Sequence, residues 1–344
     1  MPVNSDRLSG PSMHEVGALA GVSHQTVFRV IQGHSNVKES TRQRVMAAVE
    51  QLGYTPNLSA RSLVTGRSHM LGLITVGSAD TGPISSTSGF AEGFTSRARQ
   101  REYYVSATHV TDTDPQGLRT SLGYFLQQRF EGVVVLTPTM EVLNALKGAR
   151  PALPFVTLGG GSVFPENSVS LDQTRGAILA TQHLIDLGHR RIGHIAGPLR
   201  RFDAMERLGG WRETMRRNNL DASRVWEGDW SARSGSTLGQ QLFDSGATAV
   251  FCANDQTALG VMHAARLRSI RVPQDLSIVG FDDMPEAPYF PTPLTTVRQD
   301  HERLGEDSVE LLLAQIDPSY PHAEVLVEPT LVMRESTASL VSSG

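Results

Sequence analysis

Residues 12–32, SMHEVGALAGVSHQTVFRVIQ, decide the fold of the N-terminal part of this chain, because they read as two short helices joined by a tight turn. Gly21 stands where the chain must reverse with little side-chain bulk. Ser23 then precedes the second helix, and its hydroxyl can cap the free N–H groups of the first helical turn. Apolar residues recur where two crossing helices bury side chains against each other, at Val16, Val22, Val27 and Val30 or Ile31. The pattern predicts a helix-turn-helix.

Three polar side chains, His24, Gln25 and Arg29, lie on the outer face of the predicted second helix. In a major groove, Gln can pair bidentately with adenine and Arg with guanine. A plain amphipathic helical hairpin would show the same spacing, so this stretch alone leaves both interpretations open. Residues 1–69 carry seven Lys or Arg and four Asp or Glu, a net charge of +3, which leaves −7 for the rest of a chain whose total is −4. This modest basic excess is local, as binding to phosphates requires.

A third helix is predicted to begin at Ser40 or Thr41. In TRQRVMAAVEQLGY, residues 41–54, four apolar residues repeat at helical spacing and Gly53 supplies a C-terminal stop. These four residues are Val45, Ala48, Val49 and Leu52. The segment that follows, residues 54–64, is too short and too polar to be a stable helix in isolation. We expect three small helices that share one core, followed by an element that folds only conditionally.

Composition and length indicate a soluble protein of two or three domains, since 344 residues exceed one ordinary core. The single cysteine, Cys252, lies in the apolar run AVFCAN and is predicted to be buried; one thiol allows neither a disulfide nor a cysteine metal site. His189 and His194 fit no common ligand spacing, so no metal and no cofactor are predicted. Without a membrane-spanning run or the apolar core of a secretory signal, the expected location is the cytoplasm.

From Met70 onward, short apolar runs alternate with helical patterns, which predicts an α/β fold of parallel sheets covered on both faces. The runs begin at residues 71, 103, 132, 154, 192, 248 and 276, and the helical patterns lie near 89–101, 115–128, 174–187, 203–218, 234–245 and 255–268. The chain from Met70 onward is too long to form a single sheet of ordinary size. Two doubly wound lobes are therefore predicted, with a ligand between them where the carboxyl ends of strands face a cleft.

Polar side chains follow several of these strands. Asn254 and Asp282 stand at predicted strand ends, and Arg207 lies on the helix after the strand that ends near Pro198. A carboxylate, an amide and a guanidinium suit a polyhydroxylated ligand, because each sugar hydroxyl both donates and accepts. Trp230 can supply an apolar wall for a sugar ring. Each residue also has an ordinary structural explanation, as a helix cap, a surface cation or a core aromatic.

Several motifs together resemble the LacI/GalR family of bacterial transcriptional regulators, in its lac branch rather than its purine branch. They are VGALAGVSHQTVFRVIQG, TRQRVMAAVEQLGYTPNLSARSL, HLIDLGHRRIGHIAGP, RLGGW, GDWSARSG, ANDQTALGVM, SIVGFDDM and LTTVRQD, and they run in the family's order from Ser12 to Met333. The resemblance implies an α/β protein with a three-helix headpiece, a hinge helix and a two-lobed periplasmic-binding-protein-like core. The implied ranges are 1–56 for the headpiece, 57–69 for the hinge and linker, 70–170 plus 299–327 for the N-lobe, and 171–298 plus 328–340 for the C-lobe.

The resemblance also implies a homodimer that puts its second helix into the major groove of operator DNA. His24, Gln25 and Arg29 match the family's base-reading positions. The positions near phosphate are Ser12, His14, Ser23, Thr26, Gln32 and Thr41, which orient the domain without reading sequence. The hinge adds Asn57, Arg61 and Leu63 to the implied contacts. Leu63 matches the leucine that wedges into the minor groove and kinks the duplex.

Effector contacts are implied at eight positions: Asp80, Pro83, Leu158, Arg207, Trp230, Asn254, Asp282 and Gln299, with Asp282 the strongest candidate. The chain also departs from the family pattern. Gly17 replaces a usual alanine, and Phe28 replaces a common serine on the recognition helix. Gly159 stands where the lac branch has an aspartate, and Asp80 stands where it has an apolar residue. We therefore expect an effector other than an alkyl or allyl galactoside.

The sequence predicts a repressor released by a small sugar inducer, such as a β-galactoside or another disaccharide. A corepressor-type regulator of the same family is the first alternative. A two-lobed sugar-binding protein of a transport system is the second, but it leaves the headpiece unexplained and the export signal missing. An enzyme is disfavoured because the chain contains neither a GxxxxGK[ST] phosphate loop nor a GxSxG elbow. The last residues, MRESTASLVSSG, contain no leucine heptads, so a dimer rather than a tetramer is expected.

Overall fold

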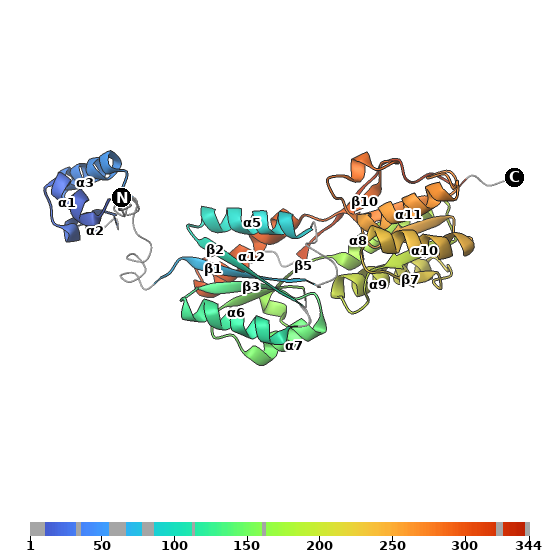
Figure 1. The fold of residues 1–344 in the computed structure, drawn as a ribbon, viewed down its shortest axis with the longest axis horizontal. Helices are drawn as coiled ribbons and strands as arrows, with labels where there is room; N and C mark the ends of the chain where they lie inside the picture. The colour runs from blue at the N-terminus through green and yellow to red at the C-terminus, as the bar shows by residue number, and fades with distance from the viewer. Residues whose placement is uncertain are drawn as a thin grey trace, which may run out of the picture. The chain divides into compact units, whose positions relative to one another are not determined.

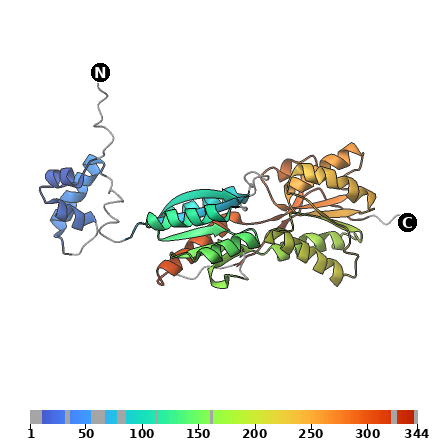
Figure 2. The same ribbon diagram turned by 60° about the horizontal axis from the view of Figure 1, so that its bottom comes forward.

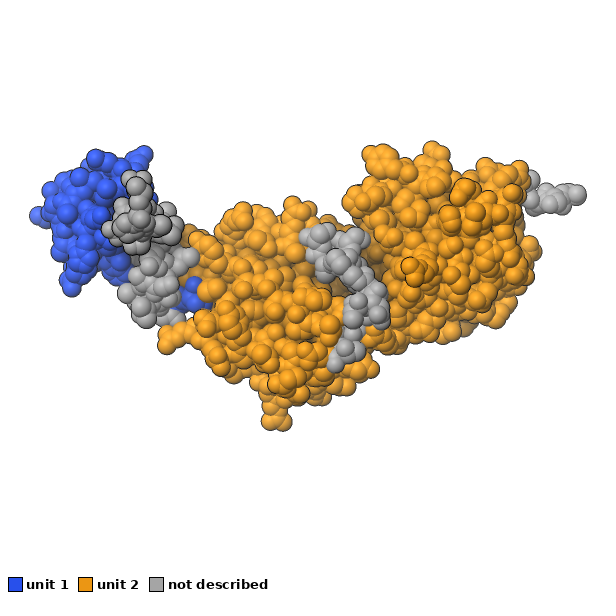
Figure 3. Space-filling model, viewed as in Figure 1, with its two compact units in different colours: residues 1–68 blue, residues 69–344 orange. Residues whose placement is uncertain are grey.

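The computed structural model describes residues 11–31, 36–54, 67–77, 86–111, 114–159, 163–320 and 326–340, without the side chains of residues 86–88. The chain divides into two compact units, residues 1–68 and residues 69–344 (Figures 1 and 3). Each unit has its own hydrophobic core, so the two are described separately.

The first unit is a three-helix headpiece of α1 (Met13–Ala20), α2 (His24–Ile31) and α3 (Glu39–Leu52). A capping box opens α1: the Ser12 hydroxyl accepts a hydrogen bond from the Glu15 N–H, and the Glu15 carboxylate accepts one from the Ser12 N–H at 2.7 Å. Gly21, with φ of 65°, ends α1 and makes the turn. The predicted helix-turn-helix is confirmed, including the Ser23 cap, whose hydroxyl accepts from the Thr26 N–H at 3.3 Å.

The headpiece core also follows the predicted spacing. Its buried members are Val16, Ala20, Val27, Val30, Val45, Ala48 and Tyr54, with Val22, Ile31, Val49 and Leu52 packed partly against them. The predicted start of the third helix is wrong by one or two residues. Helix α3 begins at Glu39, after Lys38, because the Lys38 carbonyl already accepts the first helical hydrogen bonds without any side-chain cap. A Cβ atom at Gly17 would lie 2.8 Å from the Val22 carbonyl oxygen, so the turn fits glycine closely.

The second unit contains two six-stranded sheets, and the predicted α/β fold is confirmed (Figures 1 and 2). The first sheet has the order β11-β5-β4-β3-β1-β2, with all its pairs parallel. Its strands are β1 (Met70–Gly77), β2 (Tyr104–Thr111), β3 (Gly132–Leu136), β4 (Phe155–Leu158), β5 (Ser168–Leu171) and β11 (Leu326–Val327).

Helices cover both faces of this first sheet (Figure 1). One face is covered by α5 (Ser86–Gln100) and α12 (His301–Ile316), and the other by α6 (Pro115–Gln127) and α7 (Met140–Ala149); a short 3-10 turn, η1 (Pro165–Asn167), precedes β5. The neighbouring residues Val134 and Val135 of β3 belong to different core clusters, because successive side chains of a strand point to opposite faces. The near-continuous apolar runs in the sequence reflect this burial on both faces.

The second sheet has the order β12-β10-β9-β8-β6-β7, and only the β10–β12 pair in it is antiparallel. Its strands are β6 (Ile192–Ala196), β7 (Val225–Glu227), β8 (Ala249–Cys252), β9 (Ser277–Asp282), β10 (Thr295–Arg298) and β12 (Thr330–Val332). The helices α8 (Gln173–Asp186) and α9 (Phe202–Arg217) pack on one face, and α10 (Ala232–Asp244) and α11 (Asp255–Leu267) on the other; η2 (Ala287–Tyr289) follows β9. Cys252 is fully buried in this core, as predicted.

The chain passes between the two sheets three times. It leaves the first sheet after β5 and enters α8, leaves the second sheet after β10 and enters α12, and crosses again between β11 and β12. Gln173 begins α8, and Gln299 follows β10, so both lie at crossings. Polar side chains at these crossings are therefore held next to both lobes. Across the described ranges, every helix is too short or too polar to span a membrane.

Candidate ligand cavity and nucleic-acid interface

The first sheet and its helices form the N-lobe of the second unit, and the second sheet and its helices form the C-lobe. A cavity lies between these two lobes, with an empty volume of about 1190 Å³ that includes solvent at its mouth. Its two walls differ in character. The N-lobe side is largely apolar and is formed by Val76, Phe90, Leu136, Pro138, Leu158, Val169, Leu171 and Leu304. The C-lobe side carries most of the polar groups: Gln173, Arg201, Asp203, Glu206, Arg207, Trp230, Asn254 and Asp282, with Gln299 and His301 beside them.

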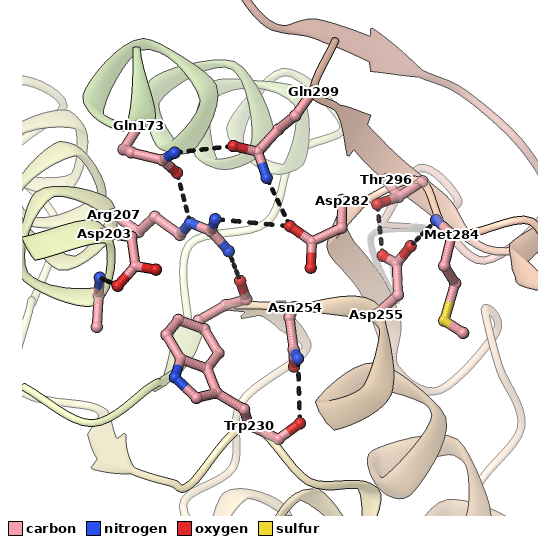
Figure 4. A network of polar contacts seen from close by, with 12 residues as sticks. Gln173, Asp203, Arg207, Trp230, Asn254, Asp255, Asp282, Met284, Thr296 and Gln299 are labelled. Atoms are coloured by element: carbon pink, nitrogen blue, oxygen red, sulfur yellow. Dashed lines mark hydrogen bonds and ion pairs between the residues drawn. The ribbon is translucent and has the colours of Figure 1, made fainter. Parts of the chain in front are cut away.

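Arg207 is the centre of the network of polar contacts on this wall (Figure 4). Only 4% of its surface is exposed. Its Nε donates to the Gln173 side-chain oxygen at 2.8 Å, its Nη1 donates to the Ala253 carbonyl, and its Nη2 lies 3.5 Å from the Asp282 carboxylate. The guanidinium also lies over the Phe281 ring, 3.8 Å from its centroid. Contacts on several sides fix the guanidinium plane, which is what directional recognition of a ligand requires.

Two glutamines extend this network across the lobe crossings. The Gln173 amide nitrogen donates to the Gln299 oxygen at 2.8 Å, and the Gln299 nitrogen donates to Asp282 at 2.6 Å (Figure 4). A chain of hydrogen bonds thus joins α8, α9 and the end of β9 to the segment that leads into α12. A ligand that replaces or bends one of these bonds changes the contacts at a crossing between the lobes.

Asp282 is held in an unusual backbone conformation, with φ of 110°, and Asp283 follows with φ of 52°. Positive φ is costly for residues other than glycine and tends to occur at functional sites. Asp283 is anchored by Arg298 and Arg334, each at 2.7 Å, so the surrounding structure holds the turn in place. Burial raises the pKa of Asp282 to about 6, although Arg207 opposes the shift. The carboxylate is therefore positioned at the cost of backbone strain and desolvation.

Trp230 and Asn254 form the next part of the wall (Figure 4). The Asn254 amide donates to the Trp230 carbonyl at 3.0 Å, and its side-chain oxygen caps α11 by accepting from Thr257. The indole packs on Gly197, where an added Cβ would lie 2.3 Å from the ring. Asn254 therefore caps α11 and also lines the cavity.

Three titratable residues of the cavity carry no recognisable sequence signal. Burial would raise the pKa of Asp203, but its ion pair with Arg201, at 2.7 Å, brings that pKa below its usual value. Glu206, one turn further along α9, has a pKa raised to about 7 by desolvation and by the nearby charges of Asp203 and Asp172. Burial lowers the pKa of His301 to about 4, so its imidazole is neutral.

Asp255 supports the cavity from behind the Asp282–Asp283 turn. Its carboxyl accepts from the Thr296 hydroxyl at 2.5 Å and from the Met284 N–H at 2.8 Å, and only 1% of its surface is exposed. Burial, and then the charge of Asp282, raise the pKa of Asp255 to about 8. Its proton is thus retained in the folded protein at neutral pH.

The raised pKa of Asp255 gives a test of stability against pH. Because the folded pKa lies above the unfolded value of 3.8, the free energy of unfolding falls as pH rises from about 4 to about 8. One such group contributes a slope of up to ~1.4 kcal/mol per pH unit. The side chain of Asp255→Asn can donate to Thr296 and accept from Met284, so the variant should fold. Its free energy of unfolding, measured in urea at pH 5, 6, 7 and 8, should fall with pH less steeply than that of the wild type, by up to ~1.4 kcal/mol per pH unit. The surface variant Asp244→Asn should keep the wild-type slope; equal slopes for both variants would contradict the assignment.

Several of the predicted contact residues of the headpiece are exposed. His24, Gln25 and Arg29 are exposed on α2. His14 of α1 is also exposed, and its ring lies 4.6 Å from that of His24, so the two imidazoles pack together across the helix pair. Ser12, Ser23 and Thr26 take part in helix capping, and Thr41 is half-buried on α3. Helix ends beside exposed polar groups suit contacts with phosphates.

The structure brings six of the predicted effector residues to one cavity: Leu158, Arg207, Trp230, Asn254, Asp282 and Gln299. Six other predicted residues lie outside the described part of the chain: Gln32, Asn57, Arg61, Leu63, Asp80 and Pro83. Sequence reasoning missed Gln173, Asp203, Glu206 and His301. Each lies in the first or second turn of a helix that follows a strand, and no local sequence pattern marks it.

Two family models match the chain. The model for bacterial regulatory proteins of the lacI family matches residues 12–57, and the model for the periplasmic binding protein-like domain matches residues 181–337. The chain is 34% identical to the lactose operon repressor of Escherichia coli strain K12 over 329 residues, covering 95% of this chain and 90% of that repressor.

Solved structures of similar proteins share the fold. A structure of the lac repressor dimer bound to operator and the anti-inducer ONPF has a TM-score of 0.84 and 33% identity, covering 96% of this chain and 100% of that one. The complex of the transcriptional regulator CelR with cellobiose has a TM-score of 0.69 and 30% identity, covering 95% and 99%.

A helix-turn-helix headpiece followed by a two-lobed, periplasmic-binding-protein-like core defines a class of bacterial transcriptional regulators. The chain belongs to the LacI family of bacterial regulatory proteins. The family resemblance stated from the sequence is thereby confirmed.

Proposed function

We propose that this protein is a repressor that binds a palindromic operator as a homodimer and is released by a small sugar held between its lobes. One observation carries the ligand half of this proposal. Arg207, Asn254, Asp282 and Gln299 come from four separate segments, and all of them line one cavity beside Trp230. Such a set provides fixed donors, fixed acceptors and an aromatic wall, which together suit a polyhydroxylated ring.

The shape and polarity of the cavity support a glycoside or disaccharide rather than a free ion. Hydroxyl groups of one sugar ring would face the polar C-lobe wall, and a less polar face or substituent would contact the apolar N-lobe wall. Gly159, with φ of 81°, lines the cavity where the lac branch has an aspartate, which supports an effector other than a simple alkyl galactoside. The likeness to a regulator solved with cellobiose supports the disaccharide class.

Release requires that the sugar bind one arrangement of the lobes better than the other. The ligand can shift the equilibrium only by its differential affinity for the two states. The Gln173–Gln299–Asp282 chain of hydrogen bonds offers a physical basis, because it lies at the crossings and is in the cavity wall. For the DNA half of the proposal, His24, Gln25 and Arg29 read bases. The hinge residues Asn57, Arg61 and Leu63 complete the contact at the centre of the operator.

The test is a fluorescence-anisotropy titration of the full chain on a palindromic operator with a central CG step. Affinity should fall steeply with salt, because contacts to phosphates release counterions. One member of a sugar panel should weaken binding at constant salt. Tightening by that sugar would instead assign the corepressor alternative, and salt-insensitive binding to any duplex would contradict operator recognition.

A further inference from the structure

Acidic side chains outnumber basic ones on the polar wall of the cavity. Asp203 pairs with Arg201 through two hydrogen bonds, of 3.1 Å and 2.7 Å. Asp282 is balanced by Arg207 at 3.5 Å. Glu206 remains: among the described residues its carboxylate accepts no hydrogen bond and forms no ion pair, although it lines the cavity and is exposed enough to meet a ligand.

We propose that Glu206 binds a cationic group of the effector, and that the effector is an amino sugar carrying a protonated amine beside its hydroxyls. The inference rests on the proposed sugar-binding function of the same cavity and names its ligand class. An ammonium group donates up to three hydrogen bonds and brings the positive charge that this wall lacks. A neutral sugar would cover the Glu206 carboxylate without balancing its charge, which costs free energy.

The surroundings of Glu206 already disfavour its negative charge. Glu206 lies three residues after Asp203 on α9, so the two carboxyls are neighbours on one face of the helix. Desolvation and Asp203 together raise the pKa of Glu206, and the smaller opposing effect of Arg207 does not reverse the shift. A ligand amine placed here would relieve this repulsion directly.

A sugar can also provide hydrogen-bond partners for two ring nitrogens of the cavity. The indole Nε1 of Trp230 and the imidazole Nε2 of His301 are both buried, and neither has a hydrogen-bond partner within the described residues. The indole nitrogen can only donate, so it needs an oxygen acceptor, and a hydroxyl can satisfy either ring. His301 is neutral and adds no positive charge near Glu206. One molecule with sugar oxygens and an amine therefore supplies partners for Trp230, His301 and Glu206.

Matched sugar pairs test the proposal, since the members of each pair differ only by amines in place of hydroxyls, one amine in each monosaccharide pair and two in the disaccharide pair. The pairs are glucosamine with glucose, galactosamine with galactose, and the β-1,4-linked glucosamine dimer with cellobiose. Calorimetric titration of the full chain at pH 7 should give, for at least one pair, an amine affinity roughly tenfold or more above that of its hydroxyl partner. This ratio corresponds to ~1.4 kcal/mol.

The variant Glu206→Gln should bring that ratio close to one, because a neutral amide cannot form an ion pair with the ligand amine. Glu213→Gln, at a half-buried position further along the same helix and outside the cavity, should keep the wild-type ratio. A ratio unchanged by Glu206→Gln would overturn the proposal. If neutral sugars bind and release the operator while amines do not, the amino-sugar inference fails and the proposed function stands. If no member of the panel binds, both fail.

Discussion

Replacing Arg207 by lysine is expected to weaken binding of the releasing sugar at least ~100-fold and to leave operator binding unchanged. Lysine keeps a positive charge beside Asp282, so the buried carboxylate is not left uncompensated. It loses the planar fork that donates to Gln173 and Ala253 and lies over the Phe281 ring. Each hydrogen bond from a charged donor to the sugar is worth ~1.5–3 kcal/mol, so misplacing the donors of two such bonds weakens sugar binding by more than ~2.8 kcal/mol, or about 100-fold.

The measurement is a pair of titrations on Arg207→Lys: sugar binding by calorimetry, and operator release by anisotropy with the sugar that releases the wild-type protein. The expected variant binds operator normally and stays bound at sugar concentrations that free the wild type. Arg216→Lys, on the exposed surface of the same helix, is the matched control and should respond as the wild type does. If the sugar releases Arg207→Lys from the operator as it releases the wild type, and the melting temperature of the variant matches that of the control, Arg207 does not bind the sugar.

The strand-end residues of the cavity were predictable, because their position follows from the topology. Asn254 comes two residues after the end of β8, and Asp282 is the last residue of β9. In an open parallel sheet the carboxyl ends of neighbouring strands meet at one edge, where ligands bind. An apolar run followed by Asn or Asp therefore locates these side chains with no knowledge of the tertiary structure.

The remaining cavity residues depend on tertiary contacts that no local pattern encodes. Gln173 lies in the cavity because the chain crosses between lobes just before it, and a crossing has no distinctive composition. Asp203 and Glu206 look like ordinary surface residues of an amphipathic helix until α9 is docked on its sheet. His301 reads as a first-turn helix residue. Burial raises the pKa of Glu206 and lowers that of His301. The ion pair with Arg201 lowers the pKa of Asp203 against the effect of burial, and the sequence specifies neither the burial nor the ion pair.

The secondary structure shows the same division. Long apolar runs such as that of β1 were located well, whereas β5, with the sequence SVSL, and the three-residue strand β7 were not predicted. These short strands are held by pairing with neighbours already in the sheet rather than by their own propensity. Helices α7 and α12 were also missing from the predicted set, although α12 covers the first sheet and its first turn lines the cavity.

Replacing Gln25 by alanine is expected to lower operator affinity at least about 30-fold. Gln25 is exposed on α2 beside the His14–His24 ring pair, and no described residue accepts or donates a hydrogen bond to its side chain, so its amide is available to a base edge. A bidentate glutamine–adenine pair is worth ~1–3 kcal/mol. A dimer on a palindrome uses two copies, which doubles the loss to ~2–6 kcal/mol. Anisotropy titrations on operators substituted one base pair at a time measure it.

The pattern of the loss separates base reading from a general electrostatic effect. If Gln25 reads one base pair, Gln25→Ala should bind the wild-type operator and the operator substituted at that position with similar affinity. Discrimination at the other positions should be retained. The slope of affinity against salt should not change, because no phosphate contact is removed. Gln51→Ala, an exposed glutamine on α3, should behave as the wild type. Unchanged discrimination at every position would move base reading to His24 and Arg29.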